Sequence, residues 1–101
     1  MTKLNEIAHA RSGDKGNHAN IGVVANSPTD FQRLRQELTA ERVAQFFAPL
    51  GPTHVERFEL PNITALNFVL HNVLAGGASQ SLRIDTQGKL LATALLEMEL
   101  S

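Results

Sequence analysis

The chain has 101 residues, of which 43% are hydrophobic and 19% charged, a balance typical of one globular domain. Its formal net charge is −1 and it has no Trp or Tyr, so we expect no nucleic-acid partner. The absence of cysteine excludes disulfides, thiolate metal sites and thiol catalysis. No apolar run approaches the roughly 20 residues that span a bilayer. We therefore expect a single domain over residues 1–101, located in the cytoplasm and without a membrane partner.

The first part of the chain predicts two strands separated by a polar loop. Residues Lys3 to Ala10 alternate in character as a strand does. The loop is predicted from Arg11 to Asn20. The apolar run from Ile21 to Ala25 is typical of a strand that is covered on both faces.

The next segment predicts helix. Ser27 can cap its first turn, Pro28 suits its first position, and Asp30 favours the positive end of the helix dipole. Because Thr39 resembles a second helix start, we expect either two short helices that meet near Thr39 or one helix bent there. The prolines in residues 48–52 end the helical segment.

A strand and a further helix are predicted to follow. The segment from His54 to Leu60 alternates, and we expect Phe58 and Leu60 to face the core. Apolar residues recur at helical spacing from Ile63 to Leu74, and Gly76-Gly77 would end that helix.

The last segment predicts a hairpin. Ser81 to Asp85 would form one strand and Leu90 to Leu100 the other, where alternate apolar residues indicate a buried face. The expected fold class is α+β and ferredoxin-like. It would have a mostly antiparallel sheet of about five strands, with helices packed on one face.

The polar loop is the strongest candidate for a binding site. Two glycines flank Asp14 and Lys15, so the backbone amides could turn toward one point and hold a small anionic ligand. Arg11 is suited to bidentate pairing with a carboxylate or phosphate. The alternative is a solvated hairpin connection, although about ten residues exceeds the usual two to five. The predicted ligand-binding residues are Arg11, Ser12, Gly13, Asp14, Lys15, Gly16, Asn20 and Asn67.

Two histidines, His18 and His71, are the candidate catalytic residues. Asn67 and His71 are four residues apart and would share one face of the predicted helix, and imidazole exchanges protons near neutral pH. The alternative is that they are polar positions facing water or an interface. His9, His18 and His71 lack the close spacing of a metal-binding pair, so we predict no metal site. Nothing in the sequence indicates a cofactor.

Several motifs resemble one family. The run from Ala8 to Gly16, followed by Asn20-Ile21-Gly22, is similar to the C-terminal ferredoxin-fold domain of the acyclic terpene utilisation protein AtuA. The likeness continues in Val55 to Asn62 and in Ser81 to Asp85, and it covers nearly the whole chain. In the longer members this domain follows a large N-terminal domain. Those proteins act in the degradation of acyclic terpenes through acyl-CoA intermediates.

The resemblance implies a freestanding small subunit that pairs with itself or with a separate large AtuA-type subunit. We expect a binding and assembly module whose Arg11–Asn20 loop contributes to a site for an acyl-CoA or an organic acid. The alternative is a self-contained hydratase, lyase or isomerase of an acyl thioester, with His18 or His71 as the acid–base group.

Overall fold

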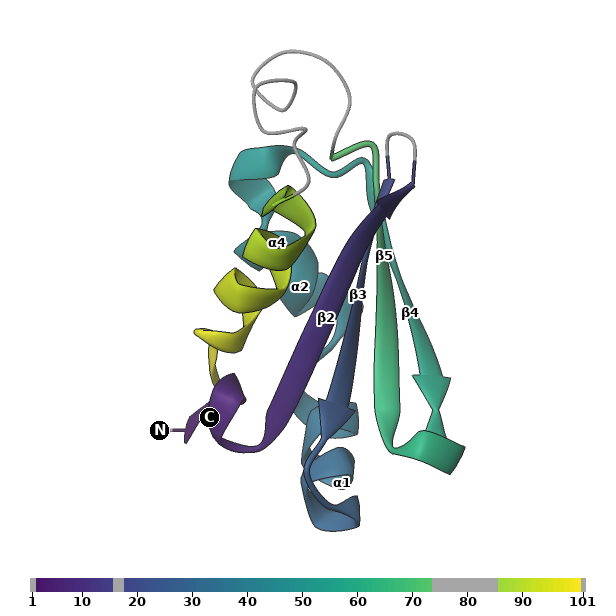
Figure 1. Ribbon diagram of the computed structural model, residues 1–101, viewed down its shortest axis with the longest axis vertical. Coiled ribbons are helices and arrows are strands. Elements are labelled where there is room, and N and C mark those ends of the chain that lie inside the picture. Colours follow the sequence, from purple (N-terminus) through teal and green to yellow (C-terminus); the bar gives the residue numbers. More distant parts are fainter. Residues whose placement is uncertain (1, 16–17, 74–85, 101) are drawn as a thin grey trace.

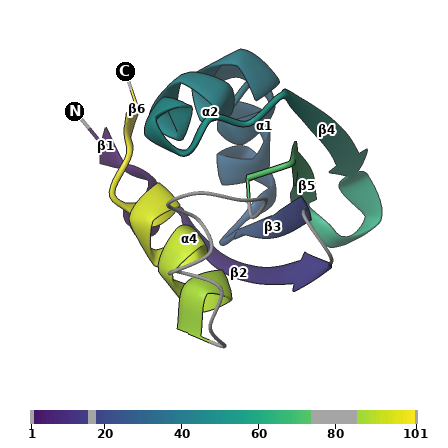
Figure 2. The same ribbon diagram turned by 90° about the horizontal axis from the view of Figure 1, so that it is seen from above.

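The structure, a computed structural model, describes residues 2–15, 18–73 and 86–100. An antiparallel sheet of four strands lies on one side of the molecule, and the helices lie on the other (Figure 1). Seen from above, the sheet curves around the helices, so one face of the sheet is covered by them (Figure 2). We call the opposite face, which no helix of the described residues covers, the open face. This arrangement confirms the α+β, ferredoxin-like fold.

The main sheet has the strand order β2-β3-β5-β4, and every neighbouring pair is antiparallel. Two hairpins, β2–β3 and β4–β5, are joined through the pairing of β3 with β5. A second, two-stranded ladder pairs the two ends of the described chain, so that the termini lie side by side (Figure 2). The strands are β1 (Thr2–Lys3), β2 (Ala8–Lys15), β3 (His18–Ala25), β4 (His54–Leu60), β5 (Ala65–His71) and β6 (Glu99–Leu100).

In the part of the chain that the structure describes, three α-helices and three short 3-10 helices connect or cover these strands. Helix α4 lies against β2, whereas α1 and α2 cover the part of the sheet nearer to β4 (Figure 2). None of the helices in residues 2–15, 18–73 and 86–100 has both the length and the apolar character that a bilayer crossing requires. The helices are η1 (Leu4–Glu6), α1 (Pro28–Glu37), α2 (Ala40–Phe46), η2 (Ala48–Leu50), η3 (Pro61–Ile63) and α4 (Thr86–Leu96).

The two-helix prediction for the middle segment is confirmed. The Ser27 hydroxyl accepts the backbone N–H of Asp30 at 3.1 Å, and the Thr39 hydroxyl accepts that of Arg42 at 3.1 Å. Each cap satisfies an amide that the first helical turn leaves without a partner. Because Thr39 caps a new helix, α1 ends before it instead of bending through it.

Two predicted elements of the second half are wrong in type. Residues Ala65–His71 form β5, not a helix, because the segment pairs with β3 and β4 and alternate side chains of it are buried in the core. Residues Thr86–Leu96 form α4, and the predicted strand from Leu90 to Leu100 survives only as the short β6. The predicted strand from Ser81 to Asp85 and the Gly76-Gly77 stop lie outside the described residues.

The first predicted strand is also corrected. Only Thr2–Lys3 and Ala8–Lys15 are extended, and η1 separates them because the chain turns from the small ladder into the main sheet.

The core lies between the helices and the covered face of the sheet. The side chains of β3 and β5 that point to this face are buried, as are the apolar side chains that α1, α2 and α4 direct toward them. The largest fully buried side chains are those of Leu4, Ile21, Val23, Leu34, Leu38, Val43, Leu66, Phe68, Leu70, Leu95 and Leu100.

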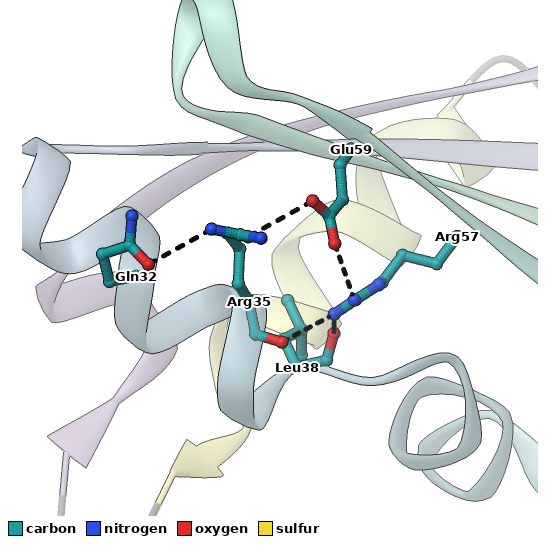
Figure 3. A network of polar contacts seen from close by, with 5 residues as sticks. All are labelled: Gln32, Arg35, Leu38, Arg57 and Glu59. Carbon is teal, nitrogen blue, oxygen red and sulfur yellow. Dashed lines mark hydrogen bonds and ion pairs between the residues drawn. The ribbon is translucent and has the colours of Figure 1, made fainter.

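Strand β4 has the opposite orientation to the one that its sequence predicts. Its Arg57 side chain points to the helices, where it donates hydrogen bonds to the carbonyl oxygens of Arg35 and Leu38 at the end of α1 (Figure 3). Phe58 and Leu60 therefore lie on the open face, where they are 46% and 43% exposed. Polar contacts, not apolar burial, fix this edge of the sheet to α1.

Candidate functional site

The Arg11–Asn20 segment is a β-hairpin, so the prediction of a ten-residue loop is wrong. Strand β2 extends to Lys15, and Gly13 lies opposite Asn20 in the ladder with β3. In an extended strand successive amides point to opposite sides and do not converge. Arg11 and Lys15 are four positions apart along the strand, which separates their Cα atoms by about 13 Å. Among the described residues, the amides of Arg11 to Lys15 therefore do not converge on one point.

Alternation along β2 divides the predicted binding residues between the two faces of the sheet. The Ser12 hydroxyl accepts the backbone N–H of Ala92 in α4 at 3.1 Å, so Ser12 faces the helices and helps to attach α4. Arg11 lies on the open face. Gly16 is outside the described residues.

The open face gathers most of the other polar residues that the sequence singles out. Cross-strand pairing aligns them in rows that run from β2 toward β4. Three such rows comprise Arg11, Gly22, Asn67 and Phe58; Gly13, Asn20, Val69 and Glu56; and His18, His71 and His54. Residues as distant in the sequence as His18 and His71 thus become neighbours, since each row collects one residue per strand.

A shallow pocket of about 400 Å³ opens on this face between β3 and β5. The Asn20 side-chain amide donates to the Asn67 side-chain oxygen at 3.5 Å, and neither amide makes a further hydrogen bond with the residues that the structure describes. A volume of this size falls within the usual range for small-molecule sites. The lining residues are His18, Ala19, Asn20, Asn67 and Val69.

A second hollow of about 370 Å³ adjoins the first and is lined in part by Arg11, His9 and Gly22. Gly22 lies between Arg11 and Asn67 in its row, so the second hollow, which Gly22 lines, lies beside the first, which Asn67 lines. Among the residues that the structure describes, none makes a hydrogen bond or ion pair with the Arg11 side chain. The guanidinium is therefore available to an anion that rests on the open face.

Histidines form one end of the open face. The ring of His71 lies between those of His18 and His54, at centroid distances of 4.7 Å and 5.4 Å. His71 Nε2 is 2.8 Å from Glu56 Oε1, and His18 Nδ1 accepts the backbone N–H of Asn72 at 3.1 Å. Both rings are therefore held in fixed orientations.

His9 does not join this cluster. It pairs with Val24 at the other end of β2, where its Nδ1 is 3.3 Å from the Asn26 side-chain oxygen. Within residues 2–15, 18–73 and 86–100, no three His, Asp or Glu side chains are placed to hold a metal ion.

Comparison with models of known protein families identifies the family of this chain. The AtuA ferredoxin-like domain matches residues 2–101. The chain belongs to the AtuA ferredoxin-like domain family. Comparison with curated proteins and with solved structures found no match.

In this AtuA ferredoxin-like domain, sequence reasoning missed Glu56 and Asn72 as partners of the histidines. The hairpin between β4 and β5 is closed by η3, and its register brings Glu56 beside Val69 and next to His71. Reading residues 65–71 as a strand would have revealed this pairing. The spacing of Asn67 and His71 does place them on one face, but through strand alternation.

Proposed function

We propose that this AtuA-family domain is a binding and assembly module whose open face forms one wall of a site for a small organic anion, of the acyl-CoA or carboxylic acid class. The observation that carries the proposal is the convergence of polar residues from β2, β3 and β5 on one uncovered face. Arg11 supplies a positive charge that no described residue pairs with, and Asn20 and Asn67 supply amide donors. The neighbouring Val69 offers an apolar surface to an acyl chain.

The proposal includes a partner that covers the open face. Pockets for small ligands bury most of the ligand surface, whereas these hollows are open on one side. Apolar side chains flank them on the β4 side, where Phe58, Leu60 and Ile63 are 46%, 43% and 60% exposed. Exposed apolar groups that lie together are typical of protein–protein contacts. A second copy of the chain or a large AtuA-type subunit would supply the second wall.

Substitution of Arg11 by Ala should weaken ligand binding without unfolding the domain, because the side chain is exposed and forms no hydrogen bond or ion pair with the described residues. Thermal unfolding in the presence of CoA, butyrate or phosphate measures this. At ten times the dissociation constant, a ligand stabilises a protein by about 1.4 kcal/mol, or roughly 5–10 °C in a domain of this size. We expect Arg11→Ala to lose most of that shift and to keep the melting temperature of the free protein.

A matched control is Lys3→Ala. It removes the same charge from β1, where Lys3 forms an exposed ion pair with Glu97 at 3.0 Å and lines neither hollow. Lys3→Ala should keep the ligand-induced shift. An equal loss in both variants would indicate a general effect of net charge and would contradict the site.

Substitution of Ile63 by Asp should weaken self-association or binding to the larger subunit, since a carboxylate in an apolar contact loses its hydration. Sedimentation velocity of the purified chain, alone and with an AtuA-type large subunit, measures the effect. We expect at least a tenfold weaker association, equivalent to about 1.4 kcal/mol. Unchanged association in Ile63→Asp would remove this surface from the proposed interface.

A further inference from the structure

We propose that His71 and His18 act as a pair in proton transfer at the carbon next to a carbonyl group, with His71 as the base and His18 as the hydrogen-bond donor to the carbonyl oxygen. The inference rests on the proposed function, because it requires an acyl compound on the open face. It adds Glu56 and Asn72 as positioning residues, each of which fixes the protonation pattern of one imidazole ring.

Glu56 orients His71. A carboxylate oxygen accepts hydrogen bonds and cannot donate them, so the 2.8 Å contact between Glu56 Oε1 and His71 Nε2 requires a proton on Nε2. The neutral ring then carries its lone pair on Nδ1, which is the atom that can accept a proton. The Glu56 carboxylate also lies where positive charge develops once His71 accepts that proton. This arrangement is that of a general base held by a carboxylate.

Asn72 orients His18 so that the other nitrogen of this ring is a hydrogen-bond donor. Its backbone N–H donates to His18 Nδ1 at 3.1 Å, so the neutral His18 ring must carry its proton on Nε2 and present it as a donor. Asn72 has a φ of 63°, a left-handed conformation that only a few non-glycine residues adopt. Its side-chain amide donates to the Thr53 hydroxyl at 2.8 Å, which holds that conformation.

The two rings are therefore complementary in function. Their centroids are 4.7 Å apart in an edge-to-face arrangement, so the ring with the Nδ1 acceptor lies beside the ring with the Nε2 donor. His18 also lines the pocket with Asn20 and Asn67, so a carbonyl oxygen that enters the pocket reaches a donor from the histidine end. Neutral imidazole is an effective donor to a developing oxyanion, as the triosephosphate isomerase case shows.

The step balances without a cofactor. The bond between hydrogen and the carbon adjacent to the carbonyl breaks, and its proton moves to His71 Nδ1. The electron pair is delocalised onto the carbonyl oxygen, where the His18 Nε2–H stabilises the charge. Return of a proton from His71 to the same carbon gives hydrogen exchange, and return to a carbon conjugated with it gives a shifted double bond. The reaction class is proton exchange or isomerisation.

The first test uses the full chain with butyryl-CoA in D2O, and proton NMR follows the loss of hydrogen from the carbon next to the thioester carbonyl. We expect exchange above the protein-free rate, because His71 supplies a base at this carbon. His71→Gln should slow it by about 100-fold or more and His18→Gln by a similar factor. The matched control is His54→Asn, which removes a ring beside His71 that the pair does not use, and it should exchange at the rate of the unmodified chain.

Thermal unfolding with butyryl-CoA, run in parallel, separates the two proposals. Binding without exchange overturns the acid–base pair and leaves the binding module intact. Exchange that persists in His71→Gln also overturns the pair. Absence of binding overturns the proposed function and this inference together.

The second test needs no ligand. At a pH where both rings are neutral, nitrogen-15 NMR should show the unprotonated ring nitrogen at Nδ1 in both His18 and His71. Glu56→Ala should mix the two tautomers of His71 and leave those of His18 unchanged, and it should slow exchange by at least tenfold. An unchanged His71 tautomer in Glu56→Ala would overturn the positioning role of Glu56, since a merely structural residue would not alter the ring protonation.

Discussion

Replacing Phe68 with Ala is expected to lower the free energy of unfolding by about 3–5 kcal/mol, the usual cost of deleting a buried aromatic ring. Phe68 is completely buried at the centre of β5 and lies opposite Ile21 of β3 in the ladder. A natural domain has a total stability of only about 5–15 kcal/mol, so the variant should lose a large part of it. Urea denaturation followed by circular dichroism measures the change.

Phe58→Ala is the matched control for that experiment. Phe58 lies on the neighbouring strand β4, but it points to the open face and is 46% exposed. We expect a loss below about 1 kcal/mol, as is usual for exposed positions. If Phe58→Ala cost as much as Phe68→Ala, the two faces would be equally buried and the open face would not be available to a ligand or partner.

Replacing Arg57 with Ala should destabilise the domain by about 2 kcal/mol, the range for hydrogen bonds that involve a charged group. The guanidinium donates to the carbonyl oxygens of Arg35 and Leu38 at 3.0 Å and 3.1 Å, and it pairs with Glu59 at 3.0 Å (Figure 3). The last carbonyls of a helix have no partner within the helix. Loss of Arg57 therefore leaves the carbonyl oxygens of Arg35 and Leu38 without this donor.

Two further variants identify the source of this effect. Arg57→Lys keeps the charge but has no planar fork of donors, so it should recover only part of the stability. Arg35→Ala removes an exposed side chain that pairs with Glu59 at 3.2 Å, and it should cost less than about 1 kcal/mol. Urea denaturation of the three variants provides the comparison. Full recovery by Arg57→Lys would assign the effect to charge alone and contradict the role of the two carbonyl contacts.

The sequence predicts the fold class correctly although it assigns the wrong type to two elements. In β5, Leu66 and Leu70 are spaced as on a helix, but Leu66, Phe68 and Leu70 are equally spaced as on a strand. Short apolar runs satisfy both periods, and pairing with β3 and β4 decides between them. The run in α4 shows the converse: Leu91 and Leu95 are buried one helical turn apart. The fold class is still predicted correctly, because one predicted helix is a strand and one predicted strand is a helix, and the two errors offset each other.

The candidate site is predicted in part. Residue type alone identifies Arg11, Asn20, Asn67 and the two histidines as candidate site residues, since these polar residues stand within or next to apolar segments of the sequence. Their meeting on one face depends on cross-strand register, which no local pattern contains. For the same reason Glu56 was not recognised from the sequence: it reads as an ordinary outward residue until β4 is placed beside His71.

Because β1 and β6 pair, any additional chain attached at either end would enter the domain at nearly the same place (Figure 2). That place is at the far end of the sheet from the histidines (Figure 1). A fused reporter, an affinity tag or an immobilising surface could thus be tethered at either terminus while the histidine end remains accessible. The same geometry suits the domain to covalent linkage with a larger neighbour, since a single hinge region would be sufficient to carry it.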